Sequence, residues 1–288
     1  MPSVCEPETV AAAAEAMRAA GGSVSIDRDG GDLVLSTRRL SRILEHEPGD
    51  LTAIVEAGLR LSELQAALAP HGQMLALDPP GDPTIGACLA GDLSGPRRHR
   101  YGAMRDLVIG VTVVLADGTV ASSGGKVVKN VAGYDLGKLF SGSRGRLGLV
   151  ARVALRLHAR PPAEATVVVE SDDPRAEWLR LHRSQLVPSA VDYLPPSRLA
   201  VLFEGAEAAV ARQVEACGGA RQPDASSWDE SAQRQLQAGG SRPFAWGDDV
   251  LLARPGFAQA WAADSPADAW SPLAERVREA FDPAGVLV

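Results

Sequence analysis

Two glycine-rich stretches decide the fold of this chain. Residues 78–98 read DPPGDPTIGACLAGDLSGPRR, and residues 129–148 read KNVAGYDLGKLFSGSRGRLG. Glycine lacks a Cβ and tolerates positive φ, so such stretches let the backbone approach a ligand closely. Consecutive backbone N–H groups then form a concave donor surface that suits a pyrophosphate. On composition alone, the alternative is a pair of surface Ω-loops.

Two familiar nucleotide-binding loops are excluded by the sequence. The chain contains no Gly-x-x-x-x-Gly-Lys-Ser/Thr motif, which excludes a P-loop. It contains no Gly-x-Gly-x-x-Gly motif after a strand, which excludes a Rossmann fingerprint. The glycines at 142, 145 and 148 have a different spacing, Gly-x-x-Gly-x-x-Gly.

The glycine-rich stretches lie among short segments with strand and helix patterns. Before residue 160 the sequence predicts helices over 8–20 and 62–68, and a short one near 134–140. It predicts strands over 32–36, 51–57, 107–115, 119–122 and 150–157. Ser62 and Gln65 stand at capping-box spacing at the start of the second helix.

A change of composition at Arg160-Pro161-Pro162 predicts a domain boundary. Beyond it the predicted order is a strand (165–170), a helix (174–186), two strands (189–194 and 198–204) and a helix (206–217). This β-α-β-β-α series is typical of a ferredoxin-like layer. A last strand over 250–253 and a terminal helix over 271–281 follow. The predicted fold class is therefore α+β, with two α/β lobes followed by a smaller ferredoxin-like domain.

Composition excludes several classes of function. The chain has 288 residues and a formal net charge of −7, which argues against a nucleic-acid partner. Its three cysteines and five histidines are scattered and predict neither a disulfide framework nor a metal cluster. No signal peptide and no run of about 18 apolar residues is found. We expect a cytoplasmic protein, and peripheral attachment to the inner membrane through partners stays open.

The same stretches carry a family resemblance. Residues 79–80, 91–98, 105–106, 129–136 and 142–148 resemble the FAD domain of the vanillyl-alcohol oxidase and p-cresol methylhydroxylase (PCMH-type) family. The runs SGPRR and KNVAGYDL within them resemble, more narrowly, the FAD-binding subunits of glycolate oxidases. The resemblance is good over roughly the segment from residue 50 to residue 160, and KNVAGYDL is its most specific part.

The resemblance implies which residues surround FAD. The first loop would line the pyrophosphate and flavin side of the cofactor through Pro79, Pro80, Thr84, Gly86, Ala87, Gly91, Ser94 and Gly95. Arg98 and Tyr101 would lie at the far end of this loop. The second loop would shape the flavin's surroundings through Lys129, Asn130, Gly133, Tyr134 and Asp135. Gly145, Gly148 and Val150 would pass near the adenine and ribose.

The resemblance also implies a domain plan and an activity. Residues 1–160 would form the PCMH-type FAD-binding domain, 161–265 a truncated ferredoxin-like substrate or cap domain, and 266–288 a C-terminal helix that returns to the FAD domain. The chain would act as an FAD-dependent subunit in the oxidation of a 2-hydroxy acid, from glycolate to glyoxylate. Its partners would be a catalytic flavin subunit and an iron–sulfur subunit.

Two departures from the family pattern leave an alternative open. Residues 24–32 read VSIDRDGGD and run directly into the next strand, so the family's early diphosphate loop is shortened. The three aspartates there would repel a diphosphate at short range. Residues 161–288 contain only His182, so we find no catalytic base for a 2-hydroxy acid and expect that chemistry on the sister chain. The alternative is a flavin-free assembly subunit that keeps the fold without FAD.

Several side chains near the loops have structural alternatives to a functional role. His99 is expected to be a solvated loop histidine, and Cys88 a packed small hydrophobe. Arg97 and Arg98 could bind phosphate bidentately or form salt bridges with the acidic surface. For Asp135 the sequence favours a helix start, because acidic residues favour the first turn.

Overall fold

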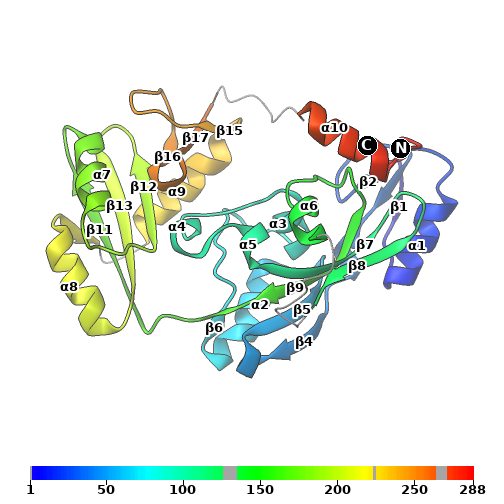
Figure 1. Cartoon of the computed structure of the whole chain (residues 1–288), viewed down its shortest axis with the longest axis horizontal. Coiled ribbons are helices and arrows are strands. Elements are labelled where there is room, and N and C mark those ends of the chain that lie inside the picture. Colours follow the sequence, from blue (N-terminus) through cyan, green and yellow to red (C-terminus); the bar gives the residue numbers. More distant parts are fainter. Residues whose placement is uncertain (1, 126–134, 223–224, 264–270) are drawn as a thin grey trace.

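The computed structural model of the chain describes residues 2–125, 135–222, 225–263 and 271–288. Figure 1 shows two parts, joined by an extended segment that leads into β11. The part at the left contains residues 163–262, and the part at the right contains the first 160 residues together with the C-terminal helix. The mixed α/β content confirms the predicted fold class.

A small parallel sheet opens the chain. Its strands are β1 (Ser3–Cys5), β2 (Val24–Ile26) and β3 (Leu33–Leu35), in the order β1-β3-β2. Helix α1 (Val10–Ala19) begins after Thr9, whose hydroxyl accepts a hydrogen bond from a first-turn N–H. The buried face of α1 packs in one cluster with Val114 and Leu149 of the next sheet. The two sheets of this part therefore share apolar packing.

An antiparallel sheet forms the centre of the same part. Its strands are β4 (Ile43–Glu47), β5 (Thr52–Glu56), β9 (Leu149–Arg156), β7 (Val108–Val114) and β8 (Val120–Gly124), paired in that order. Short helices pack against it: α2 (Leu61–Leu68), α3 (Ile85–Ala90), α5 (Met104–Leu107) and α6 (Leu136–Phe140). Helix α4 (Arg98–Tyr101) instead contacts strand β12 (Ala190–Leu194) of the second part. Strand β6 (Gln73–Met74) pairs with β10 (His158–Ala159) beside them.

The second part is a seven-stranded antiparallel sheet. Its strands are β14 (Ala220–Gln222), β11 (Ala163–Glu170), β13 (Arg198–Gly205), β12 (Ala190–Leu194), β16 (Leu252–Arg254), β17 (Gln259–Ala262) and β15 (Gly240–Pro243), paired in that order. Its helices are α7 (Pro174–Arg183), α8 (Glu207–Cys217) and α9 (Ser226–Gln237). The first four strands form the ferredoxin-like arrangement that the sequence predicts. The remaining three strands extend that sheet.

The C-terminal helix packs on the first part of the chain. Helix α10 (Pro272–Phe281) places Phe281 against Phe140, with ring centroids 6.1 Å apart. Beyond it, Leu287 is buried and forms a parallel bridge with Val24. The chain therefore ends beside its own first sheet (Figure 1).

One local prediction about a helix start is wrong. Gln65 does not complete a capping box with Ser62. Instead its amide donates to the Leu75 carbonyl at 2.6 Å and accepts from the Leu75 N–H at 3.2 Å. The Ser62 hydroxyl donates to Asp82 at 2.9 Å. Spacing alone could not show this, because both side chains find better partners on a loop that folds back over the helix.

Candidate functional site

Close backbone packing explains several glycines of the two loops. A Cβ added at Gly95 would lie 1.7 Å from the carbonyl oxygen of Asp78, so only glycine fits there. Gly86 and Gly148 approach Ala57 and Val114 in the same way. These three predicted cofactor glycines therefore hold the loops against the chain itself, whatever further role a ligand gives them.

The start of α3 uses two more of the predicted residues. The Thr84 hydroxyl accepts a hydrogen bond from the Ala87 N–H at 3.1 Å, which caps the helix. In the second loop, Asp135 caps α6 by accepting from the Lys138 N–H at 3.2 Å. This confirms the predicted helix start at Asp135. Val150 is a buried core residue of β9.

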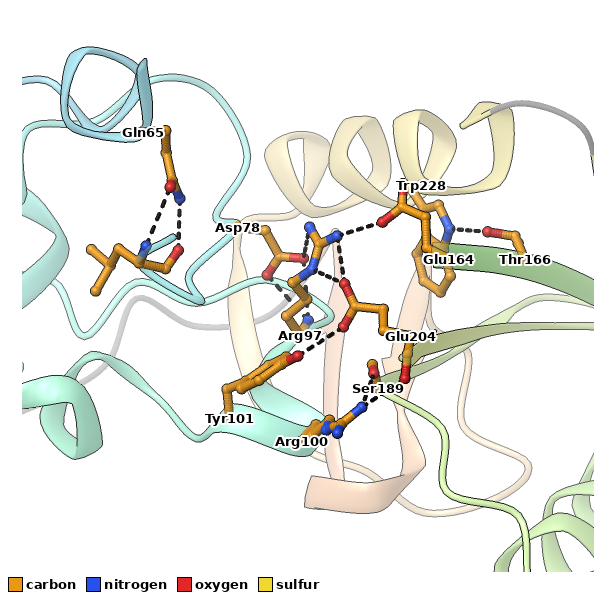
Figure 2. A network of polar contacts seen from close by, with 11 residues as sticks. Gln65, Asp78, Arg97, Arg100, Tyr101, Glu164, Thr166, Ser189, Glu204 and Trp228 are labelled. Carbon is orange, nitrogen blue, oxygen red and sulfur yellow. Dashed lines mark hydrogen bonds and ion pairs between the residues drawn. The ribbon is translucent and has the colours of Figure 1, made fainter. Parts of the chain in front are cut away.

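A polar network joins the first loop to the seven-stranded sheet (Figure 2). The Arg97 guanidinium binds Glu204 at 2.9 Å and Glu164 at 3.1 Å, and its backbone N–H donates to Asp78 at 3.1 Å. Tyr101 donates to the other oxygen of Glu204 at 3.2 Å. Of the two roles considered for Arg97, the structure supports the salt bridge. Tyr101 serves the same contact between the two parts of the chain.

Asp78 has an unusual environment within this network. Burial raises the pKa of its carboxyl to about 6, although the nearby charges of Arg97 and Arg254 oppose the rise. An acid with a raised pKa beside a cleft is a common feature of functional sites. No pattern in the sequence singled out Asp78, because the charges around it come from distant segments.

The first cleft lies beside this network and is here named the α9 cleft. It has a volume of about 510 Å³ and lies between the first loop, α9 and the strands β11, β13 and β14. Pro79 and Pro80 line it, so two predicted residues face this space. Trp228 forms part of the wall and donates from its indole N–H to Thr166 at 2.8 Å.

The second cleft is here named the α10 cleft. It has a volume of about 680 Å³, within the usual range for ligand sites. Gly91 and Arg98 of the predicted set line it, together with the loop after α6 and the first turns of α10. Gly142 has φ +78° and an open side, where an added Cβ would meet only Asp92 at 3.9 Å.

The α10 cleft has the donors that a phosphate needs. Arg98 and Arg144 both line it. The Ser143 hydroxyl is buried, and no described residue accepts or donates to it. Arg28 lies close enough to Arg144 and Arg146 for their charges to help burial lower its pKa. A buried hydroxyl among guanidinium groups fits an anionic ligand such as the FAD diphosphate.

The shortened early loop satisfies its own acidic groups. Asp27 accepts from the Thr37 N–H at 2.6 Å and from the Thr37 hydroxyl at 2.5 Å. Asp32 accepts from the N–H and hydroxyl of Ser23, both at 2.9 Å. Two of the three aspartates expected to repel a diphosphate are therefore engaged in holding the loop.

Other predicted residues occupy structural positions. Ser94 accepts from Arg98 at its hydroxyl and from Gln235 at its carbonyl. A Cβ on Gly145 would contact Ile26 of the first sheet at 3.3 Å. The predictions for Lys129, Asn130, Gly133 and Tyr134 lie outside the described residues.

Two alternatives for single residues are now decided. The expectation of a solvated His99 is wrong, because its ring packs between Trp178 and Phe257 with centroids 6.3 and 5.9 Å away. Burial lowers the pKa of His99. Cys88 is a packed small hydrophobe, as expected, since it is fully buried and burial raises the pKa of its thiol to about 12.

Comparisons with known proteins agree with this geometry. Residues 4–124 match the model of a family described as an FAD binding domain. The chain is 33% identical over 204 residues to the glycolate oxidase subunit GlcE of Escherichia coli, which covers 67% of this chain and 56% of that protein. It is 34% identical over 182 residues to the glycolate oxidase subunit GlcD of Bacillus subtilis, covering 62% of this chain and 39% of that protein.

A mitochondrial D-lactate dehydrogenase [cytochrome] of Saccharomyces cerevisiae is 38% identical over 133 residues, covering 46% of this chain and 23% of that protein. The chain thus matches at most 56% of the length of these three relatives. A solved structure of alkyldihydroxyacetonephosphate synthase shares the fold, with a TM-score of 0.63 at 18% identity over 81% of this chain and 55% of that one.

No described helix is long and apolar enough to cross a membrane. No group of three or more metal-binding side chains was found within the described part of the chain. The matching family and the shared fold together lead to one conclusion: residues 4–124 form an FAD-binding domain of the PCMH type.

Proposed function

We propose that this chain is the FAD-binding subunit of a complex that oxidises a 2-hydroxy acid, with glycolate as substrate and glyoxylate as product. Its similarity to two glycolate oxidase subunits supports this proposal. FAD would supply the two-electron acceptor, while the protein supplies binding, orientation and electrostatics. The proposed partners are a catalytic flavin subunit and an iron–sulfur subunit.

The α10 cleft is the observation that carries the cofactor proposal. Its buried Ser143 hydroxyl needs a hydrogen-bond partner, because leaving a buried polar group unpaired is costly. Arg98 and Arg144 supply positive charge in the same cleft. We assign these three side chains to the FAD diphosphate, with Gly91 and Gly142 leaving room for its approach.

The contacts beside the α9 cleft support a division of the chain into domains. The network around Arg97 connects the first loop to the seven-stranded sheet directly beside this cleft. Residues 1–160 would therefore form the FAD-binding domain, and residues 161–265 a cap that the network holds in place. Residues 266–288 would return to close the α10 cleft through α10.

Replacing either of two alanines of α10 with phenylalanine tests the cofactor site. Ala274 lines the α10 cleft, whereas Ala280 is exposed and does not line it. Ala274→Phe should weaken FAD binding by at least about tenfold, or about 1.4 kcal/mol. Ala280→Phe should leave it within about twofold, since surface changes away from the site have small effects. Flavin absorbance of the purified protein and titration of flavin fluorescence measure both.

The same experiment addresses the flavin-free assembly subunit. The packing role of Gly86, Gly95 and Gly148 favours this second candidate, because these glycines are needed without any cofactor. A colourless wild-type protein that binds no added FAD would support it and refute the FAD-binding proposal. Purification from native cells, with the partners identified by mass spectrometry, tests the proposed complex independently.

A further inference from the structure

Arg254 is a buried charge with one edge left without a partner. It lies at the end of β16 and is 1% exposed. Its Nε donates to Asp192 at 3.0 Å, its Nη2 donates to Gln235 at 2.9 Å, and its guanidinium lies 4.4 Å from the Trp261 ring centroid. No described residue accepts a hydrogen bond from Nη1.

The Arg254 side chain forms part of the wall of the α9 cleft. Arg254 lines this cleft together with Gln235, which holds the guanidinium. Three contacts fix the orientation of the group, so Nη1 cannot turn to solvent without breaking them. A fixed, desolvated guanidinium edge beside a cavity is suited to an oxygen acceptor from a ligand.

The other walls of the α9 cleft restrict the size and charge of that ligand. Pro79, Pro80 and Trp228 provide apolar surface. Gln222 lines the cleft, and its buried side-chain oxygen accepts no hydrogen bond from any described residue. This arrangement offers one donor edge and one acceptor between apolar walls, which suits a small polar molecule.

Charge then favours a monoanion over a phosphate. The lining contains three arginines (Arg97, Arg221, Arg254) and three acids (Asp78, Glu164, Asp229). Arg97 is already bound to Glu204 and Glu164. A dianion would meet the nearby carboxylates with little uncompensated positive charge. A single carboxylate needs only one donor edge.

We infer that the α9 cleft binds a small carboxylate, one oxygen of which accepts from Nη1 of Arg254. This places an anion site on the FAD-binding chain itself, separate from the α10 cleft. It goes beyond the proposed function, because it requires neither FAD nor a partner subunit. The Gln222 oxygen is placed to accept from a hydroxyl of the same ligand.

The test uses glycolate and its uncharged analogue glycolamide as probes of the full chain by isothermal titration calorimetry. Ala232→Leu narrows the cleft from α9 and leaves the Arg254 contacts intact, because Ala232 lines the cleft without touching them. Gln233→Leu places the same side chain on the exposed side of that helix as the matched control. Arg254→Met removes the donor itself.

Glycolate should bind the wild type and the Gln233→Leu variant alike, and glycolamide should bind at least about tenfold more weakly. Ala232→Leu and Arg254→Met should each weaken glycolate binding by about tenfold or more. If Arg254→Met fails to fold, the Ala232→Leu variant still decides the question. Equal binding of glycolate by Ala232→Leu and wild type would overturn the inference, as would equal binding of the two probes.

Repeating the titration after adding FAD separates this inference from the cofactor proposal. Flavin bound per chain is read from absorbance in the same samples. If FAD and glycolate exclude each other one for one, they share one cleft, and the inference of a carboxylate site separate from the cofactor is wrong. If no FAD binds while glycolate still does, the cofactor proposal fails and the carboxylate site stands.

Discussion

The pair of Asp192 and Arg254 allows one stability prediction to be worked out in detail. Both side chains are buried, at 0% and 1% exposure, and their charged atoms lie 3.0 Å apart. Replacing Asp192 with Asn leaves the Arg254 charge in the core without its counter-charge. Removing one partner of a buried pair costs about 3–5 kcal/mol. That is a large part of the total stability of about 5–15 kcal/mol expected for a protein.

Tryptophan fluorescence is a suitable measurement of this loss. Four of the five tryptophans, Trp178, Trp228, Trp246 and Trp261, lie in the part of the chain that contains the pair. Urea unfolding followed by this signal should give a free energy lower by about 3–5 kcal/mol for Asp192→Asn. The exposed Asp172→Asn is the matched control and should stay within about 0.5 kcal/mol of the wild type.

Replacing both Asp192 and Arg254 tests whether the unpaired charge causes the loss of stability. A well-packed apolar pair often matches or exceeds a buried ion pair in stability. The double variant Asp192→Leu with Arg254→Met should therefore recover most of the loss seen for Asp192→Asn. A loss below about 1 kcal/mol for Asp192→Asn would refute the argument that a stranded charge is costly here. So would a double variant no more stable than the single one.

Three further predictions concern the same regions. The raised pKa of Asp78, about 6, means that the folded state binds the proton more tightly than the unfolded state does. The free energy of unfolding of the wild type should therefore fall by roughly 2–3 kcal/mol relative to that of Asp78→Asn as pH rises from about 4 to 7. Parallel curves of stability against pH for the two proteins would contradict this. Gly95→Ala forces a Cβ onto the Asp78 carbonyl and should lower urea stability by about 3 kcal/mol or more, whereas Gly21→Ala, with nothing within 4 Å, should stay close to wild type. In thiol labelling at neutral pH, the half-buried Cys5 should react first, and Cys88, with a pKa of about 12, only after unfolding; rapid labelling of Cys88 in the folded chain would show that its burial is wrong.

The sequence alone determined the longer elements and the resemblance to FAD-binding domains. Alternating apolar residues, turn dipeptides and glycine spacing act over a few residues, so β7, β9, α7 and α10 could be predicted close to their observed bounds. The short strands β1, β2, β14, β15 and β17 were missed, because each contains only three or four residues and forms only when a distant strand pairs with it.

Tertiary structure alone decided what each site residue does. Arg97 meets Glu204 across 107 positions of sequence, Gln235 meets Ser94 across 141, and Arg254 meets Asp192 across 62. No local pattern marks such partners, since they depend on how the seven-stranded sheet and its helices lie against the first loop. For the same reason the sequence could show only that the two loops need glycine. The packing of the folded chain shows that Gly95 fits against the Asp78 carbonyl, whereas Gly142 opens toward a cleft.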